Sequence, residues 1–250
     1  KDDGNWTQRQ VLEKAISQEN LNSTIWNKEL NEKVKSFVKD YLSNKEKYSS
    51  QIDDLWTFNH IIQTINYNFQ ERREREKIIF ENDLALKTKI GLENKKQFAK
   101  YGYGHLQKFK EGNYPCFFTR LIENNIYPRE NIITIIGYLT KSKVLWNKKY
   151  GKKGNYKGYT TKAGYGISDY WKEYFKGIKN LKKSKLSDLT MFKLNQVGSP
   201  YFYGTDLVEI KMFLKDHNTT KLKGKNTLQF IDYAILISNS KEQIPIEEMK

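Results

Sequence analysis

LQFIDYAILIS, residues 228–238, is an apolar, partly alternating run rich in β-branched and aromatic side chains. A run of this kind is typical of a β-strand when turn-like sequence borders it, and KDHNTTKLKGKN, residues 215–226, is such a border. Two further apolar, partly alternating runs precede it: LTMFKL at 189–194 and LVEIKMFL at 207–214. We therefore expect three strands of one sheet from Leu189 onward.

The middle of the chain adds a fourth candidate. ENIITIIGYL, residues 130–139, is also rich in β-branched residues. Because periodicity does not separate a short buried strand from a buried helix, either structure is open for this segment.

The first hundred residues predict helices. Apolar residues recur there at steps of three and four, the spacing of an amphipathic helix, first at Trp26, Leu30, Val34, Phe37, Val38, Tyr41 and Leu42, and again at Leu55, Phe58, Ile61, Ile62, Ile65 and Phe69. PCFFTRLIENN, from Pro115, predicts one more helix.

The order of these segments predicts the fold class. We expect an α+β or α/β protein in which a helical N-terminal half is followed by a mixed β-sheet in the C-terminal half. The corresponding regions are residues 1–110 and 111–250, although a single domain of this length is equally open.

Composition restricts the partners and the compartment. The formal net charge is +15, and such an excess attracts polyanions, either nucleic acid or an anionic membrane. No stretch approaches the length of a transmembrane helix, and a single cysteine, Cys116, allows neither an internal disulfide nor a cysteine-rich zinc site. We expect a cytoplasmic protein, although a leader removed before Lys1 is open.

The basic charge is concentrated between Lys141 and Lys185. This span holds fourteen lysines and two acids, a net +12, and we expect it to be a loop. Its section KKYGKKGNYKGYTTKAGYG, residues 148–166, combines lysines that neutralise phosphates with tyrosines that stack on bases and glycines that allow close approach. A solvated loop and a membrane-binding patch are the alternatives. The residues expected to bind nucleic acid are Lys148, Lys149, Lys152, Lys153, Tyr156, Lys157, Tyr159 and Lys162.

An acid-x-lysine pair lies within the run 207–214. On an extended strand Glu209 and Lys211 share one face, as an ordinary ion pair or as part of a catalytic site. A Mg²⁺-dependent nuclease needs two carboxylates on the metal and a lysine near the attacking water. Asp188 supplies the second carboxylate if its strand pairs with that of Glu209. Asp206 is closer in sequence, but on a continuous strand it points to the opposite face unless a bulge at Gly204 and Thr205 intervenes.

This layout of Asp, spacer and Glu-x-Lys resembles the PD-(D/E)xK superfamily, the fold of many type II restriction endonucleases. The resemblance covers about twenty-five residues, and Ser187 stands where the family has proline before its first acid. It implies that Asp188 or Asp206 binds Mg²⁺ together with Glu209, and that Lys211 assists the attacking water.

Together these patterns predict a nucleic-acid-binding protein that hydrolyses DNA phosphodiester bonds with Mg²⁺, with DNA favoured over RNA. Two alternatives stay open. One is a metal-independent ribonuclease or toxin that uses His217 with a glutamate as acid and base. The other is a protein that binds nucleic acid without cutting it.

Overall fold

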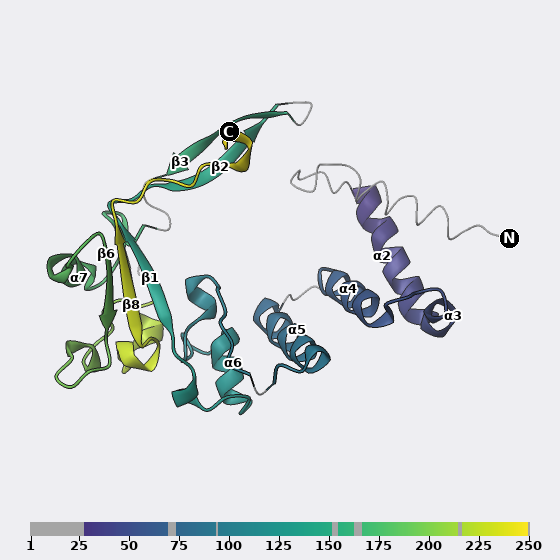
Figure 1. Ribbon diagram of the computed structural model, residues 1–250, viewed down its shortest axis with the longest axis horizontal. Helices are drawn as coiled ribbons and strands as arrows, with labels where there is room; N and C mark the ends of the chain where they lie inside the picture. Colours follow the sequence, from purple (N-terminus) through teal and green to yellow (C-terminus); the bar gives the residue numbers. More distant parts are fainter. Residues whose placement is uncertain are drawn as a thin grey trace. The chain divides into compact units, whose positions relative to one another are not determined.

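The computed structural model describes residues 28–69, 74–93, 95–151, 155–162, 167–214 and 217–249, shown in Figure 1. It divides the chain into two compact units, one up to Leu86 and one from Lys87 onward. Most of the described helices lie in the first half of the chain, and the described strands lie in the second. The protein is therefore an α+β protein, as the sequence predicts.

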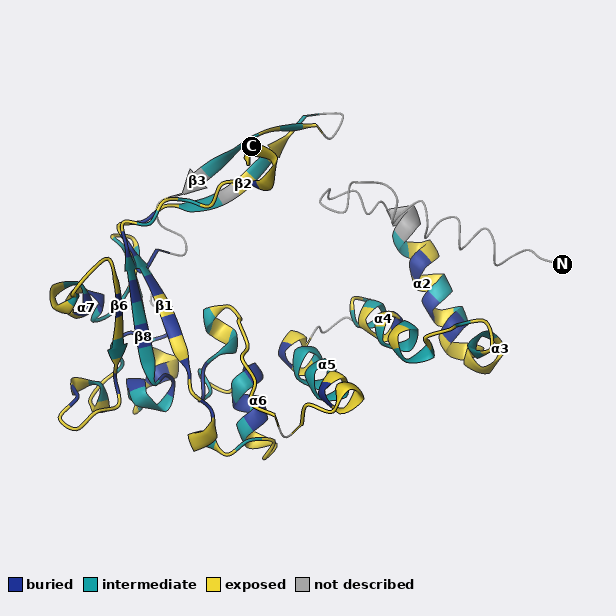
Figure 2. Cartoon of the chain, viewed as in Figure 1, coloured by how far each residue is buried: buried dark blue, intermediate teal, exposed yellow. Residues whose placement is uncertain are grey.

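The first unit is helical. Its core contains Val34, Val38, Tyr41 and Ile62, which lie at the predicted spacing, and Figure 2 shows buried positions recurring along α2. The N-cap Asp54 accepts a hydrogen bond from the Thr57 backbone N–H at 3.0 Å. Trp26 lies outside the described residues. The helices are α2 (Lys28–Ser43), α3 (Lys45–Ser49), α4 (Leu55–Tyr67) and α5 (Arg75–Ile90), the last of which continues into the second unit.

The described part of the second unit contains three small sheets and two further α-helices. A mixed sheet has the strand order β1-β8-β6, in which β1 runs parallel to β8 and β6 runs antiparallel to it. β2 and β3 form a hairpin, and β4, β5 and β7 form an antiparallel sheet. The elements are α6 (Phe117–Glu123), β1 (Ile135–Thr140), β2 (Val144–Tyr150), β3 (Tyr156–Lys162), β4 (Asp169–Tyr170), β5 (Glu173–Phe175), α7 (Ile178–Ser184), β6 (Leu189–Lys193), β7 (Ile210–Met212) and β8 (Tyr233–Ser238).

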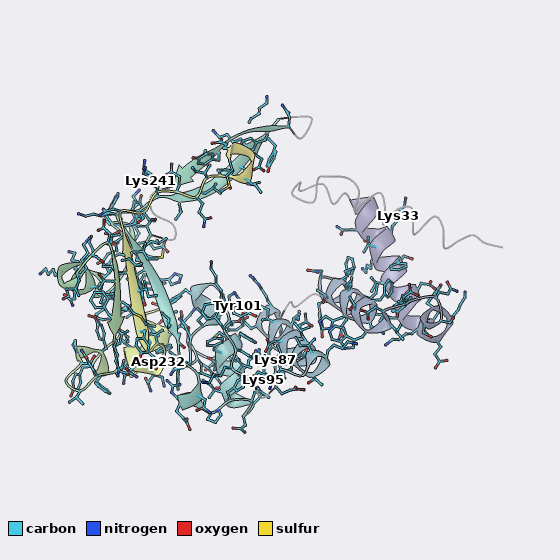
Figure 3. The ribbon with its side chains drawn as sticks, in the orientation of Figure 1. Lys33, Lys87, Lys95, Tyr101, Asp232 and Lys241 are labelled. Carbon is cyan, nitrogen blue, oxygen red and sulfur yellow. The ribbon has the colours of Figure 1, made fainter. Side chains whose placement is uncertain are left out.

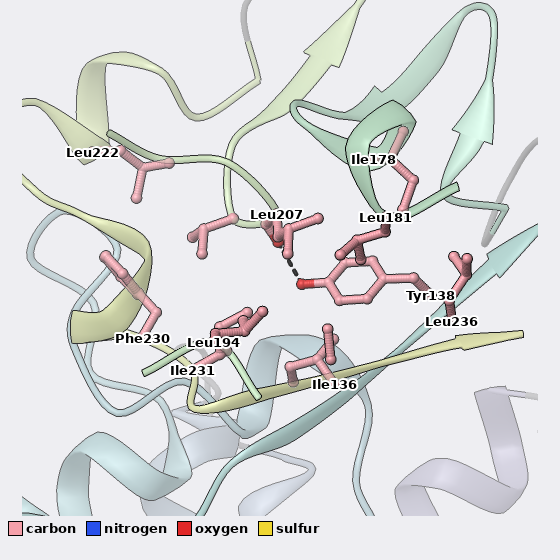
Figure 4. Packing of buried hydrophobic residues seen from close by; sticks show 12 residues of the cluster. Ile136, Tyr138, Ile178, Leu181, Leu194, Leu207, Leu222, Phe230, Ile231 and Leu236 are labelled. Carbon is pink, nitrogen blue, oxygen red and sulfur yellow. Dashed lines mark hydrogen bonds between the residues drawn. The ribbon is translucent and has the colours of Figure 1, made fainter. Parts of the chain in front are cut away.

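The main core lies against the β1-β8-β6 sheet. Tyr138 of β1 and Leu236 of β8 are fully buried, and Ile178 and Leu181 of α7 pack in the same cluster, shown in Figure 4. The Tyr138 hydroxyl donates a hydrogen bond of 2.5 Å to the backbone carbonyl of Leu207. This bond ties the loop before β7 to the sheet.

Two strand predictions are confirmed and a third is wrong in part. β6 lies in the run 189–194 and pairs with β8, which occupies the second part of the run 228–238, after a 3-10 turn at Thr227–Gln229. The undecided segment 130–139 contains β1. In the run 207–214, however, only Ile210–Met212 is extended, and this strand pairs with β5 in another sheet. The chain turns before it, because the Glu209 backbone N–H bonds to the Thr205 carbonyl at 2.8 Å and Leu207 has φ +69°.

The segment 141–185 is not a simple loop. It contains the β2-β3 hairpin, the strands β4 and β5, and helix α7. Within the described residues, no helix is long and apolar enough to cross a membrane.

Candidate nucleic-acid interface

The β2-β3 hairpin carries most of the predicted nucleic-acid contacts. Lys148 lies opposite Tyr159, and Tyr150 lies opposite Tyr156. Residues directly opposite each other project to the same side of a hairpin, so these four side chains share one side, which we call the aromatic face. The ring centroids of Tyr150 and Tyr156 are 6.0 Å apart.

A glycine makes this arrangement possible. Tyr156 and Tyr159 are three residues apart, and on a regular strand they would project to opposite sides. The pairing shifts between Lys148 and Tyr150. Opposite this irregularity Gly158 has φ +109°, a backbone conformation that residues other than glycine rarely adopt. The bulge therefore places both tyrosines on the aromatic face.

The other side of the hairpin presents lysines. Lys149 and Lys157 alternate with residues of the aromatic face and are exposed, and we call this side the lysine face. Among the described acidic residues, none forms an ion pair with either lysine. Lys152 and Lys153 lie outside the described residues, and the side chain of Lys162 is not described.

The chain returns to the hairpin after β8. It passes Lys241, labelled in Figure 3, and its last described turn, Ile246–Glu248, lies beside the hairpin in Figure 1. Glu247 accepts hydrogen bonds from Lys148 Nζ at 2.9 Å and from the Tyr150 hydroxyl at 3.4 Å. Glu248 accepts one from the Tyr156 hydroxyl at 2.7 Å. The hydrogen bond with Glu247 raises the pKa of Lys148, and the same bond lowers the pKa of Glu247.

Glu209 is a buried carboxylate that several donors surround. It is only 4% exposed, and Thr205 and Thr219 each donate a hydroxyl bond of 2.5 Å to it. Lys211 forms a close ion pair with the same carboxylate, and Lys176 Nζ lies 3.4 Å away. Burial by itself would raise the pKa of Glu209, but the hydrogen bonds from Lys211, Thr205 and Thr219 outweigh it and lower this pKa to about 2.

Asp206 lies in the same cluster as Glu209. Lys176 Nζ lies 3.6 Å from the Asp206 carboxylate, so one ammonium group contacts both acids. The expectation that Asp206 faces away applies to a continuous strand, and the turn over Thr205–Glu209 replaces that strand. Gly177, with φ +76°, allows this approach, since a Cβ atom there would collide with the Asp206 carboxylate.

Asp188 lies in a different setting. It accepts hydrogen bonds from Lys185 Nζ at 2.7 Å and from the Asn239 side chain at 3.0 Å, and both lower its pKa. The strand that follows it, β6, pairs with β8 and not with β7, so the strand pairing that would bring Asp188 beside Glu209 does not form.

The described carboxylates do not form a ready magnesium site. Glu209 receives two threonine hydroxyls and contacts two lysines, which leaves its oxygens little capacity for a metal ion. Among the residues that the structure describes, no group of three or more His, Cys, Asp and Glu side chains is placed to hold one. Asp206 and Glu209 fit a divalent cation only if Lys176 leaves the position between them.

One exposed aromatic pair is not evident from the sequence. Trp171 and Phe213 are 60% and 66% exposed, their ring centroids are 5.5 Å apart, and Lys172 Nζ lies 4.7 Å from the Trp171 ring. We call these three residues the tryptophan platform. The backbone of Phe213 bonds to that of Lys172 at 2.9 Å beside the β5-β7 pairing, so the contact depends on tertiary structure that no local sequence signal reveals.

His217, the acid-base candidate of the ribonuclease alternative, lies on the surface. It is exposed beside the fully buried Asn218, and no described carboxylate accepts a hydrogen bond from it.

Comparison with known proteins assigns no family. Neither a protein-family model nor a curated protein matches the sequence. The chain is similar to a solved crystal structure of a protein from Bacillus cereus, at 13% identity and a TM-score of 0.41. The similarity covers 85% of this chain and 52% of that protein, so the chain spans about half of its length. A likeness at this level establishes neither a shared fold nor an activity.

Proposed function

We propose that this protein binds nucleic acid, and that the β2-β3 hairpin is its main contact. The observation that carries the proposal is that both sides of this hairpin carry lysines and that one side also carries a row of tyrosines. Lys149 and Lys157 are exposed on its lysine face, while three tyrosines lie on the other face. The surrounding span 141–185 carries a net +12 of the chain's +15.

The chemistry of the two faces suits a polynucleotide. Lysines that neutralise phosphates release counterions, which gives affinity that depends steeply on salt. Tyrosines stack on unpaired bases or donate hydrogen bonds to phosphate oxygens. The tryptophan platform, with two exposed rings and the ammonium group of Lys172, offers a second stacking surface in the same unit. These features favour single-stranded segments, and the preference for DNA over RNA rests on the restriction-enzyme resemblance alone.

The test is equilibrium binding of fluorescein-labelled single-stranded DNA and RNA by fluorescence anisotropy over a series of salt concentrations. We expect a linear fall of log K with log salt. The Lys149→Ala/Lys157→Ala variant should bind more weakly, with a slope smaller by about 1.4, because two single-strand phosphate contacts each contribute about 0.7.

The matched control is Lys35→Ala/Lys39→Ala, which removes the same charge from exposed positions of α2. If the control weakens binding as much as the hairpin variant, the hairpin is not the contact. If the wild-type protein binds neither nucleic acid at low salt, the proposed function is wrong.

A second candidate, Mg²⁺-dependent hydrolysis of phosphodiester bonds, is favoured by one observation. The Asp206 and Glu209 carboxylates both contact Lys176 Nζ, so a cation already occupies the position between them. A bound Mg²⁺ would polarise the phosphate and lower the pKa of a water molecule. In this proposal Asp206 and Glu209 hold the metal after Lys176 has moved away, and Lys211 remains beside Glu209 to contact the phosphate.

Incubation of supercoiled plasmid and of structured RNA with Mg²⁺ or EDTA tests this candidate. DNA cleavage that EDTA and Glu209→Gln both abolish supports it, and Lys176→Ala should lower the Mg²⁺ concentration that cleavage requires. If no DNA cleavage occurs under any of these conditions, hydrolysis is rejected as a function, and the binding proposal is unaffected. RNA cleavage that survives EDTA and disappears in His217→Ala would instead support the ribonuclease alternative.

A further inference from the structure

The aromatic face is occupied by the chain itself. Three of its donors, Lys148 Nζ and the hydroxyls of Tyr150 and Tyr156, bond to the carboxylates of two successive residues, Glu247 and Glu248. The lysine face has no such cover among the described residues. The two sides of one hairpin therefore differ in what they can offer to a ligand.

The contacts have the chemistry of phosphate recognition. Lysine ammonium and tyrosine hydroxyl groups are donors that bind phosphate oxygens in protein complexes with nucleic acids. A carboxylate presents the same kind of acceptor, an anionic oxygen, to these donors. Glu247 and Glu248 are also consecutive, so they present two anions in a row, as a polynucleotide backbone does.

The path of the chain holds this acidic segment near the hairpin. Just after β8, the Ser240 backbone N–H bonds to the Ser142 hydroxyl at 3.0 Å, and the Ser240 carbonyl accepts from the Lys143 N–H at 3.2 Å. These bonds fix the segment at the base of the hairpin, a few residues before Glu247. Its effective concentration at the aromatic face is therefore high.

We propose that Lys148, Tyr150 and Tyr156 form a binding site for the phosphates of a polynucleotide, and that Glu247 and Glu248 compete for this site from within the chain. The inference rests on the proposed function, since it names the phosphate site on the hairpin and its regulation. Nucleic acid binds the aromatic face only when the acidic segment has left, so the apparent affinity is reduced by the fraction of molecules in which the face is covered.

The Glu247→Gln/Glu248→Gln variant tests this competition, because it removes the negative charge of both side chains. Both side chains lie at the surface, so the protein should fold as before. Exposed ion pairs are individually weak, so we expect about 3- to 10-fold tighter binding of labelled single-stranded DNA at low salt, and a smaller gain at high salt. Fluorescence anisotropy measures the affinity at both salt concentrations.

Two further variants show whether a gain in affinity comes from the released donors or from the change in overall charge. Glu32→Gln/Glu46→Gln removes the same charge from exposed positions of the first unit and should leave the affinity nearly unchanged. Adding Lys148→Ala and Tyr156→Phe to the Glu247→Gln/Glu248→Gln variant should abolish its gain, because the released donors are then missing.

Each remaining outcome is decisive. If the wild type binds and the Glu247→Gln/Glu248→Gln variant binds equally or more weakly, the competition is wrong and the proposed function stands. An equal gain in the Glu32→Gln/Glu46→Gln control would assign the effect to overall charge and overturn the site. If neither the wild type nor any variant binds, the proposed function fails and the inference fails with it.

Discussion

At the scale of single residues, Glu209 shows how a buried charge is retained. A carboxylate that is 4% exposed costs free energy unless donors replace its lost water, and here two threonine hydroxyls and two lysines do so. Its pKa of about 2 keeps it ionised at neutral pH. The same donors stabilise the turn that brings Asp206 to Lys176, so a structural role accounts for the whole arrangement even if no chemistry occurs there.

The Glu209→Gln substitution should lower the free energy of unfolding by about 1–3 kcal/mol at pH 7, because charge-assisted hydrogen bonds become neutral ones. The pKa of Glu209 is lower in the folded protein, about 2, than its ordinary value of 4.5. Its contribution is therefore complete above about pH 4.5 and is lost as the pH falls from there toward 2.

Urea denaturation of both proteins between pH 7 and pH 3, followed by far-UV circular dichroism, measures this difference. We expect the gap between wild type and variant to narrow below about pH 4.5. Glu130→Gln, at an exposed position, is the control and should show almost no gap at any pH. A gap that is constant over the whole range would contradict the assignment of the low pKa to Glu209.

At the scale of elements, the hairpin and the small β4-β5-β7 sheet present exposed aromatic residues. Both depend on short strand pairings: Tyr150 meets Tyr156 across the hairpin, and Phe213 meets Trp171 beside the pairing of β5 with β7. The rings are held by the backbone of small sheets and not by a packed core. The rings of Trp171 and Phe213 are exposed and available for stacking with a ligand, whereas the hydroxyls of Tyr150 and Tyr156 bond to Glu247 and Glu248.

Trp171→Ala should weaken binding of single-stranded nucleic acid about 5- to 150-fold, because stacking on one aromatic ring is worth about 1–3 kcal/mol per base. Phe98→Ala removes another exposed ring, 91% exposed, outside the hairpin and the platform, and should have little effect. Fluorescence anisotropy at one fixed salt concentration compares the two variants. Equal affinities would exclude the tryptophan platform from the interface.

The sequence predicts the elements better than their pairing. The spacing of Val34, Val38 and Tyr41 predicts α2, because steps of three and four residues place these side chains on one face of a helix. The runs that contain β6 and β8 predict strands because turn-like segments border them. The run 207–214 misleads, because its apolar alternation also fits a buried turn followed by a short strand. A positive φ at Leu207 is held by long-range contacts, such as the bond from Tyr138, which local sequence does not show.

The candidate site is predictable to a similar extent. Concentrated lysine and tyrosine indicate a polyanion-binding segment from composition alone. The shared position of Tyr156 and Tyr159 depends on the bulge at Gly158, and the contacts of Glu247 and Glu248 join residues nearly one hundred positions apart. The expected place of Asp188 beside Glu209 depends on a strand pairing that the observed sheet order replaces.

At the scale of the whole molecule, the chain separates a helical unit from a unit that carries the basic segment. The second unit, from Lys87 onward, contains the hairpin, the tryptophan platform and the Asp206–Glu209 cluster. The helical unit has its own small core around Tyr41 and Ile62. Binding to nucleic acid is therefore expected to map onto the second unit, with the hairpin as its centre.

Ultraviolet cross-linking of wild-type protein to labelled single-stranded DNA at low salt, followed by mass spectrometry of the linked peptides, locates this contact. We expect cross-links at the tyrosines of the hairpin, Tyr150, Tyr156 and Tyr159, and at Trp171, all of which high salt suppresses. Cross-links confined to the helical unit, or none at any salt concentration, would show that the hairpin is not the nucleic-acid contact.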